Sequence, residues 1–154
     1  MKAKLGEETD DLQRALSNQR TRQALGDWIA ENEWDILASI TFRTIADYEY
    51  AKKRFKTFFR YRLNTQEEIY FENDIFCFVI YEQVKPYVGI HIHALIKGIH
   101  PLKSEALQKR CCSFFGNSKV EPYRKNDNGR WYLANKFGRS LVEFDTCLIS
   151  RFSY

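Results

Sequence analysis

The sequence predicts an α+β fold: a ferredoxin-like (RRM-like) sandwich in which helices pack on one face of a central antiparallel sheet of about five strands. Two observations lead to this fold class. Segments of strand-like and helix-like composition follow one another in the order strand, helix, strand, strand, helix, strand. Hydrophobic residues make up 44% and aromatic residues 16% of the 154-residue chain, so one domain with a buried core is expected.

A helix or a pair of helices is expected in front of this unit, over residues 9–33. The segment contains no proline, and its apolar residues Leu12, Leu16, Leu25 and Trp28 are separated by polar residues. The next segment, 35–43, is expected to be a buried strand. Alternation along that strand gives two faces, with Ala38, Ile40 and Phe42 on one and Ser39, Thr41 and Arg43 on the other.

Residues 46–62 are expected to form an amphipathic helix. Apolar side chains recur at helical spacing: Tyr48, Ala51, Phe55, Phe58 and Phe59. The other side of the helix and its end are basic: Lys52, Lys53, Lys56, Arg60 and Arg62. Positive charge of this kind can bind a nucleic-acid backbone, but a solvated helix surface explains most of these residues better.

The rest of the chain supplies the remaining elements, with β-rich segments bounded by glycine or proline. Strands are expected at 75–82, 89–97, 118–124 and 141–149, and helices at 103–115 and 130–137. The two strands at 75–82 and 89–97 follow each other closely, which favours a hairpin. The histidines of the second strand are then expected on the open face of the sheet, opposite the helices.

The net charge of +4 is unevenly distributed. Residues 1–35 hold eight acidic against five basic residues, a net of −3, whereas residues 36–154 hold nineteen basic against twelve acidic residues, a net of +7. The basic body is compatible with a phosphate-rich partner, and ordinary solubility charge is the alternative.

Cysteine spacing and apolar run length bear on the cellular compartment. Cys77, Cys111, Cys112 and Cys147 form no C-x-x-C pair, which favours reduced thiols in an intracellular, cytoplasmic protein. We expect no secretory signal and no membrane-spanning segment, because the N-terminus is polar and the longest apolar runs fit single strands.

The most informative motif is His91-Ile92-His93 within an apolar run. On a strand both imidazoles point to the same face, where they can hold a divalent metal between them. Glu82 ends the preceding strand and would lie beside one of the histidines in a hairpin. A carboxylate with two imidazoles suits Mg²⁺ or Mn²⁺. The alternative is a surface strand with two chance histidines and an exposed acid.

A second candidate group follows at Tyr132 and Lys136. The two residues are four apart and would share one face of a helix. A tyrosine hydroxyl near a cation and a metal-polarised phosphate is competent for phosphoryl transfer. Packing within an aromatic-rich helix is the alternative role for this tyrosine.

Together these segments resemble the three motifs of the HUH endonucleases, in particular the rolling-circle replication initiators (Rep proteins) of plasmids and viruses. The resemblance covers about residues 35–138 and rests on Ile40-Thr41-Phe42, on Glu82 with His91-Ile92-His93-Ala94-Leu95-Ile96-Lys97-Gly98, and on Tyr132-Leu133-Ala134-Asn135-Lys136. It implies one endonuclease domain over residues 1–154. The parts of that domain would be a helical extension (1–34), a catalytic core (35–138) and a C-terminal strand or tail (139–154).

The resemblance also implies roles for individual residues. His91 and His93 would be metal ligands, with Glu82 as the third, and Tyr132 would attack DNA to form a 5′-phosphotyrosine link and leave a 3′-hydroxyl. Lys136 would steady the phosphate; because it occupies the place where a second tyrosine is common, a single-tyrosine enzyme is expected. Three residues on the sheet are candidates for DNA contact: Arg43, Thr41 and Lys97.

The implied partner is single-stranded DNA at a replication origin. A host helicase and polymerase would also be needed, because neither a helicase domain nor a P-loop follows. Two other functions remain open: a single-tyrosine insertion-sequence transposase, and a non-catalytic ferredoxin-like nucleic-acid-binding module. A metal-dependent phosphodiesterase that uses water is a weaker alternative. The N-terminal helix would pack on the sheet, contact a second subunit in a homodimer, or mask the DNA face.

Overall fold

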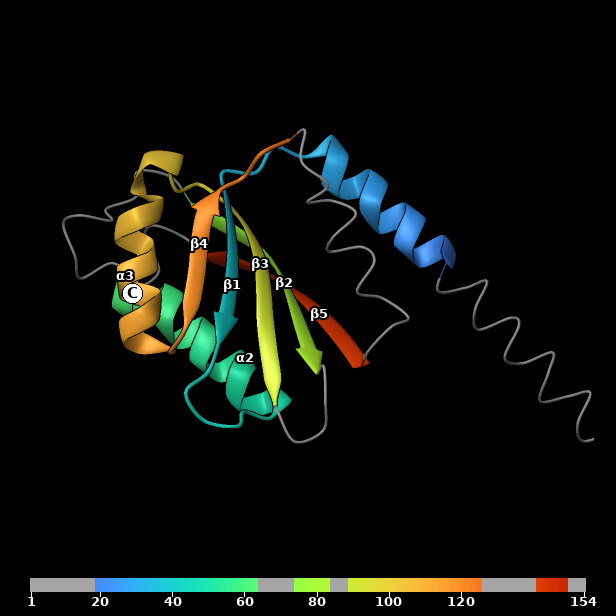
Figure 1. Ribbon diagram of the computed structural model, residues 1–154. Coiled ribbons are helices and arrows are strands. Elements are labelled where there is room, and N and C mark those ends of the chain that lie inside the picture. The colour runs from blue at the N-terminus through green and yellow to red at the C-terminus, as the bar shows by residue number, and fades with distance from the viewer. Residues whose placement is uncertain (1–18, 64–73, 84–88, 126–140, 150–154) are drawn as a thin grey trace, which may run out of the picture.

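The computed structural model describes residues 19–63, 74–83, 89–125 and 141–149, and within these residues the helices and strands follow one another in the predicted order (Figure 1). The elements are β1 (Ile36–Thr41), α2 (Tyr48–Thr57), β2 (Ile75–Gln83), β3 (Ile90–Lys97), α3 (Ser104–Phe114), β4 (Ser118–Pro122) and β5 (Leu141–Ile149). A helix that is described from residue 19 to residue 31 precedes β1, and we call it the N-terminal helix.

Within the described residues the strands form one five-stranded sheet in the order β4-β1-β3-β2-β5. Every neighbouring pair is antiparallel. The unit β1-α2-β2-β3-α3-β4 places β1 and β3 at the centre, which is the ferredoxin-like arrangement, and β5 adds a strand beside β2. The predicted α+β class and its central antiparallel sheet are therefore confirmed.

The predicted elements differ from the observed ones mainly at their ends. The helix predicted over 46–62 is α-helical only to Thr57, and a π-helical turn follows over Phe58–Arg62. Both Phe58 and Phe59 are buried there, and the wider π turn accompanies the burial of these two consecutive aromatic residues. Asp47 caps the start of α2, because its side chain accepts a hydrogen bond from the backbone N–H of Tyr50.

A 3-10 turn, Pro101–Lys103, leads into α3, so the helix predicted from residue 103 has a proline-initiated entry. The predicted helix over 130–137 lies outside the described residues, as do residues 9–18 of the helix predicted over 9–33. In the described part of the chain, no helix combines the length and the apolar character needed to cross a membrane.

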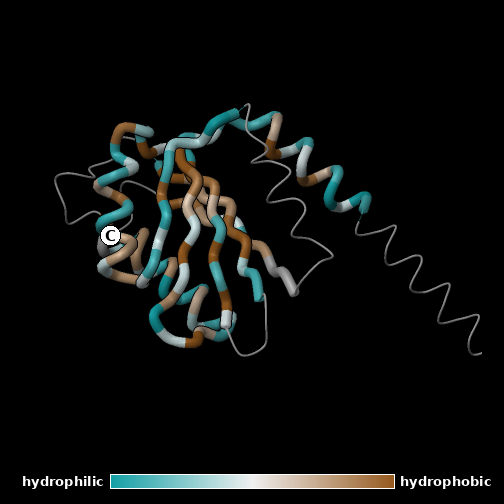
Figure 2. Tube along the Cα trace, viewed as in Figure 1, coloured by the Kyte–Doolittle hydropathy of each residue, from teal (hydrophilic) through white to brown (hydrophobic). Residues whose placement is uncertain are grey.

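The main core lies between the sheet and the two helices α2 and α3, which cover the same face (Figure 1). Alternate strand residues point into it, among them Ala38, Ile40, Ile92 and Ala94. The hydrophobic segments run along the central strands (Figure 2). Rings from the helices complete the core: Phe55 and Phe59 have centroids 4.6 Å apart, and both are fully buried.

The opposite face of the sheet is not fully open, which corrects the expectation for the histidine face. Ile29 of the N-terminal helix packs against Phe78, Ile80 and Leu95, and this second cluster is buried. The indole N–H of Trp34 donates a hydrogen bond to the carbonyl of Ile29, 3.0 Å away, and ties the end of the helix to the sheet. Packing on the sheet, one of the three roles left open for this helix, is therefore observed.

Candidate metal centre

His91 and His93 lie side by side on β3, which is the central strand of the sheet. Their neighbours Ile90, Ile92 and Ala94 belong to the main core under the helices. Because side chains alternate along a strand, both imidazoles lie on the face opposite α2 and α3. The predicted common orientation of the two histidines is confirmed.

Glu82 of β2 lies beside both histidines, as the hairpin prediction required. It is the cross-strand partner of His91 in the β2–β3 register. Its Oε1 atom lies 3.3 Å from Nε2 of His93. Glu82 is only 3% exposed and His93 only 6%, so the contact is shielded from water. Buried charged or polar groups of this kind need partners, which the pair supplies.

Ser39 lies on the other side of His93 and had no predicted role. It is the cross-strand partner of His93 in the β1–β3 register, and its Oγ lies 3.3 Å from Nδ1 of His93. In the contact with the Glu82 carboxylate, Nε2 of His93 is the donor, and the serine hydroxyl can donate to Nδ1. With an ion between Glu82 and His93, the serine oxygen would instead accept the Nδ1 proton, which leaves the Nε2 lone pair for the ion. The sequence feature that could have identified Ser39 is its position on the same strand face as Thr41.

The donor atoms suit a divalent cation. Two imidazoles and one carboxylate come from adjacent central strands, and the Nε2 atom of His91 is buried within the protein. Nitrogen and oxygen donors of this type bind Mn²⁺ and related ions. Oε1 of Glu82 and Nε2 of His93 would both become ligands, so their direct contact has to open when an ion enters between them.

The side chains do not already surround one point. Among the described residues, no group of three or more His, Cys, Asp or Glu side chains is disposed so that it could hold a metal ion. Glu82 and His93 are in direct contact, as two ligands of one ion would have to be nearly so. His91 lies in register with Glu82 and needs a change of side-chain orientation to join them.

The three residues predicted to contact DNA are dispersed. Thr41 is the cross-strand partner of His91. Arg43 directs its guanidinium to the end of α3, where it donates to the carbonyl oxygens of Cys112 and Ser113 at 3.0 and 3.4 Å. Lys97 lies on the histidine face at the far end of β3, about 20 Å from His91 at the usual rise per residue. Only Thr41 is thus next to the candidate metal ligands.

Tyr132 and Lys136, the predicted nucleophile and its accompanying cation, lie outside the described residues. The basic residues of α2 lie on the other side of the molecule from the histidines. Lys52 and Lys56 each form an ion pair with Asp145 of β5, at 3.5 and 3.7 Å. Partly exposed pairs of this kind are ordinary surface interactions, in line with the solvated-helix explanation.

Comparisons with known proteins do not assign the chain to a family. No family model matches the chain, and neither a curated protein nor a solved structure matches it.

Proposed function

We propose that this protein nicks and rejoins single-stranded DNA with a divalent metal and a tyrosine nucleophile, and that it initiates rolling-circle-type replication of a plasmid or virus in the cytoplasm of a host cell. The observation that carries the proposal is the position of Glu82, which lies in register with His91 and contacts His93 on the same face of two adjacent strands. This is the ligand set that the motif resemblance implies.

The proposed reaction is a transesterification at one phosphodiester. A new bond forms between the Tyr132 phenolic oxygen and phosphorus, and the bond from phosphorus to the 3′ oxygen breaks. The phenol loses its proton, and the departing oxygen gains one to become the 3′-hydroxyl. The resulting phosphotyrosine ester keeps the strand attached and conserves the energy for rejoining.

Each protein group has a defined part in this scheme. Bound Mg²⁺ or Mn²⁺ would supply charge stabilisation at the phosphate oxygens. His91, His93 and Glu82 would hold that ion, and Ser39 would keep His93 in the tautomer that binds it. Lys136 follows Tyr132 by four residues and would hold the phosphate or the cleaved end by its charge.

The decisive experiment detects the covalent adduct and its polarity. A pool of random-sequence single-stranded oligonucleotides, labelled in one sample at the 5′ end and in the other at the 3′ end, is incubated with protein and Mn²⁺ and run on a denaturing gel. We expect the 3′ label to move with the protein, because a 5′-phosphotyrosine link retains the downstream part of the strand. Tyr132→Phe should abolish the band.

Two control variants make the result specific. Tyr61→Phe removes an exposed hydroxyl from the turn after α2 and should leave the adduct unchanged. His91→Ala should abolish cleavage while DNA binding is retained. Cleaved product without any adduct would instead indicate a phosphodiesterase that uses water. Binding without metal dependence, product or adduct would indicate a nucleic-acid-binding module.

A further inference from the structure

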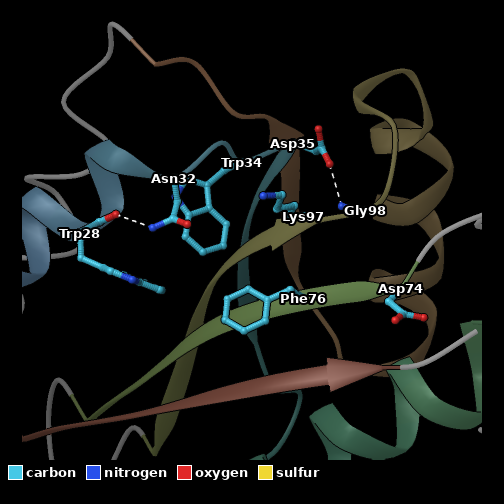
Figure 3. Close-up of a pocket in the computed structure, with 8 residues that line it drawn as sticks. All are labelled: Trp28, Asn32, Trp34, Asp35, Asp74, Phe76, Lys97 and Gly98. Carbon is cyan, nitrogen blue, oxygen red and sulfur yellow. Dashed lines mark hydrogen bonds between the residues drawn. The ribbon is translucent and has the colours of Figure 1, made fainter.

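A second site lies at the other end of the two strands that carry the candidate metal ligands. It is a pocket of about 620 Å³ between the end of the N-terminal helix and the ends of β2 and β3 (Figure 3). Three aromatic rings and several polar groups line it. The residues that matter for its chemistry are Trp28, Asn32, Trp34, Asp35, Phe76 and Lys97.

The aromatic side of the pocket is a preformed stacking surface. The rings of Trp34 and Phe76 are nearly parallel, with 29° between their planes and 6.0 Å between their centroids. The ring of Trp28 makes a T-shaped contact with each of them, and its centroid lies 5.6 Å from that of Trp34 and 6.5 Å from that of Phe76. Trp28 and Phe76 are only partly buried, so their rings face the pocket (Figure 3). Planar heterocycles stack on such surfaces.

Hydrogen bonds hold this aromatic wall in place. The indole N–H of Trp34 donates to the carbonyl of Ile29. The side-chain amide of Asn32 donates to the carbonyl of Trp28 at 2.7 Å, as Figure 3 also shows. The Trp34 ring and the backbone that carries Trp28 are therefore fixed before any ligand enters, which lowers the entropy cost of binding.

The polar side offers one cation and carboxylate oxygens. Oδ2 of Asp35 accepts a hydrogen bond from the backbone N–H of Gly98 at 2.7 Å, which fixes the carboxylate. A carboxylate has further acceptor capacity on its second oxygen and can accept from the exocyclic amino group of a base. Lys97 lies at the same end of the pocket (Figure 3), where its charge can pair with a phosphate.

The pocket and the candidate metal centre are related by the sheet register. Phe76 pairs with Lys97, and Glu82 pairs with His91, on the same two strands. The two pairs are six residues apart and on the same face, and so about 20 Å apart. A single strand long enough to reach both sites would thus be held at two points on one side of the sheet.

We propose that this pocket binds one base of the single-stranded DNA substrate, several nucleotides away from the phosphate that is cut. The base stacks on the ring of Phe76 with the ring of Trp28 against its edge, its exocyclic amino group donates to Asp35, and its phosphate pairs with Lys97. Cytosine, adenine and guanine carry such an amino group, whereas thymine does not. The proposal rests on the function proposed above, which supplies the substrate class.

Binding of mononucleotides tests the pocket without any need for metal or cleavage. The intrinsic tryptophan fluorescence, to which Trp28 and Trp34 contribute, is followed while dCMP, dAMP, dGMP or dTMP is added to the full-length protein. We expect saturable quenching by the three amino-bearing nucleotides and weaker binding of dTMP. Phe76→Leu keeps an apolar side chain but removes the ring, and should weaken binding about 5- to 150-fold.

Lys97→Ala should weaken nucleotide binding. The slope of log affinity against log salt concentration should also fall by about one, the amount expected for one lost phosphate contact. Tyr61→Ala, an exposed aromatic on another surface, is the matched control and should bind as the unmodified protein does. The pocket proposal is wrong if Phe76→Leu and Lys97→Ala both bind normally, if no nucleotide binds, or if dTMP binds as tightly as the others.

The same titration with His91→Ala separates the two proposals. Normal nucleotide binding is expected in this variant, because His91 lies far from the pocket along β3. If the unmodified protein forms the adduct in the nicking assay but binds no nucleotide, the pocket proposal alone is overturned. Nucleotide binding without any adduct would overturn the nicking function and leave the pocket as part of a nucleic-acid-binding module.

Discussion

Glu82 and His93 lie on adjacent central strands and meet at 3.3 Å, between Oε1 and Nε2, in a part of the sheet that is almost closed to water. Two buried polar side chains in the interior of a sheet cost stability unless they satisfy each other. Hydrophobic residues of similar size would fill this place at lower cost. The pair is therefore better explained by a task, and metal binding is the task its atoms fit.

Glu82→Gln tests whether this carboxylate is a metal ligand. The amide keeps the size of the side chain and a hydrogen bond to His93, but it loses the charge that attracts a divalent cation. We expect Mn²⁺ affinity, measured by calorimetry, to fall at least about tenfold, a loss of the size seen when metal-site partners are removed. The melting temperature should change little. Unchanged Mn²⁺ affinity would remove Glu82 from the ligand set.

Ser39→Ala tests whether the serine positions His93. Loss of the hydroxyl removes the partner of Nδ1, so the metal-binding tautomer of His93, with its lone pair on Nε2, would lose the hydrogen bond that stabilises it. Mn²⁺ affinity should fall about 10- to 100-fold. Ser39→Thr restores a hydroxyl with a side chain that suits a strand and should recover most of the affinity. Equal loss in both variants would indicate a packing effect instead.

The sheet and the orientation of the histidines could be predicted because both follow from period-two alternation. Ile90, Ile92 and Ala94 are apolar and must enter the core, so His91 and His93 have to point the other way. The position of Glu82 beside the histidines could also be predicted, because the short connection between β2 and β3 makes the two strands a hairpin.

Other features depend on tertiary contacts that local patterns do not contain. The contact between Ser39 and His93 requires β1 to lie beside β3, which is fixed by the sheet order. The pocket requires Trp28 and Trp34, before β1, to meet Phe76 on β2. Arg43 was expected to face DNA, but the unpaired carbonyls at the end of α3 attract its guanidinium.

Gly98→Ala tests the turn that ends β3. Gly98 has φ +107°, a conformation that residues with a side chain rarely adopt, and a Cβ there would collide with the backbone carbonyl of Asp74. We expect a loss of about 1–3 kcal/mol in the free energy of unfolding, measured with urea. Leu102→Ala, at a highly exposed position, should stay within about 0.5 kcal/mol. Equal stability of the two variants would contradict the strained geometry.

Alkaline pH should destabilise the fold because buried acids ionise only after unfolding. Burial raises the pKa of the Cys77 thiol well above its usual value of 9.0, and burial likewise raises the pKa of Cys111. Above about pH 9 the unfolded chain therefore binds fewer protons than the folded chain, and the free energy of unfolding falls as the pH rises.

The slope expected for each such thiol approaches about 1.4 kcal/mol per pH unit once the pH exceeds the unfolded pKa. Urea titrations between pH 8 and pH 10.5, a range that brackets about pH 9 where an unfolded thiol ionises, measure it. Cys77→Ala removes one of these groups, so its stability should fall less steeply with pH than that of the unmodified protein, even though its cavity lowers stability at every pH. Leu102→Ala, which removes no titratable group, should keep the original slope. Identical slopes in all three proteins would show that Cys77 is not the buried acid described here.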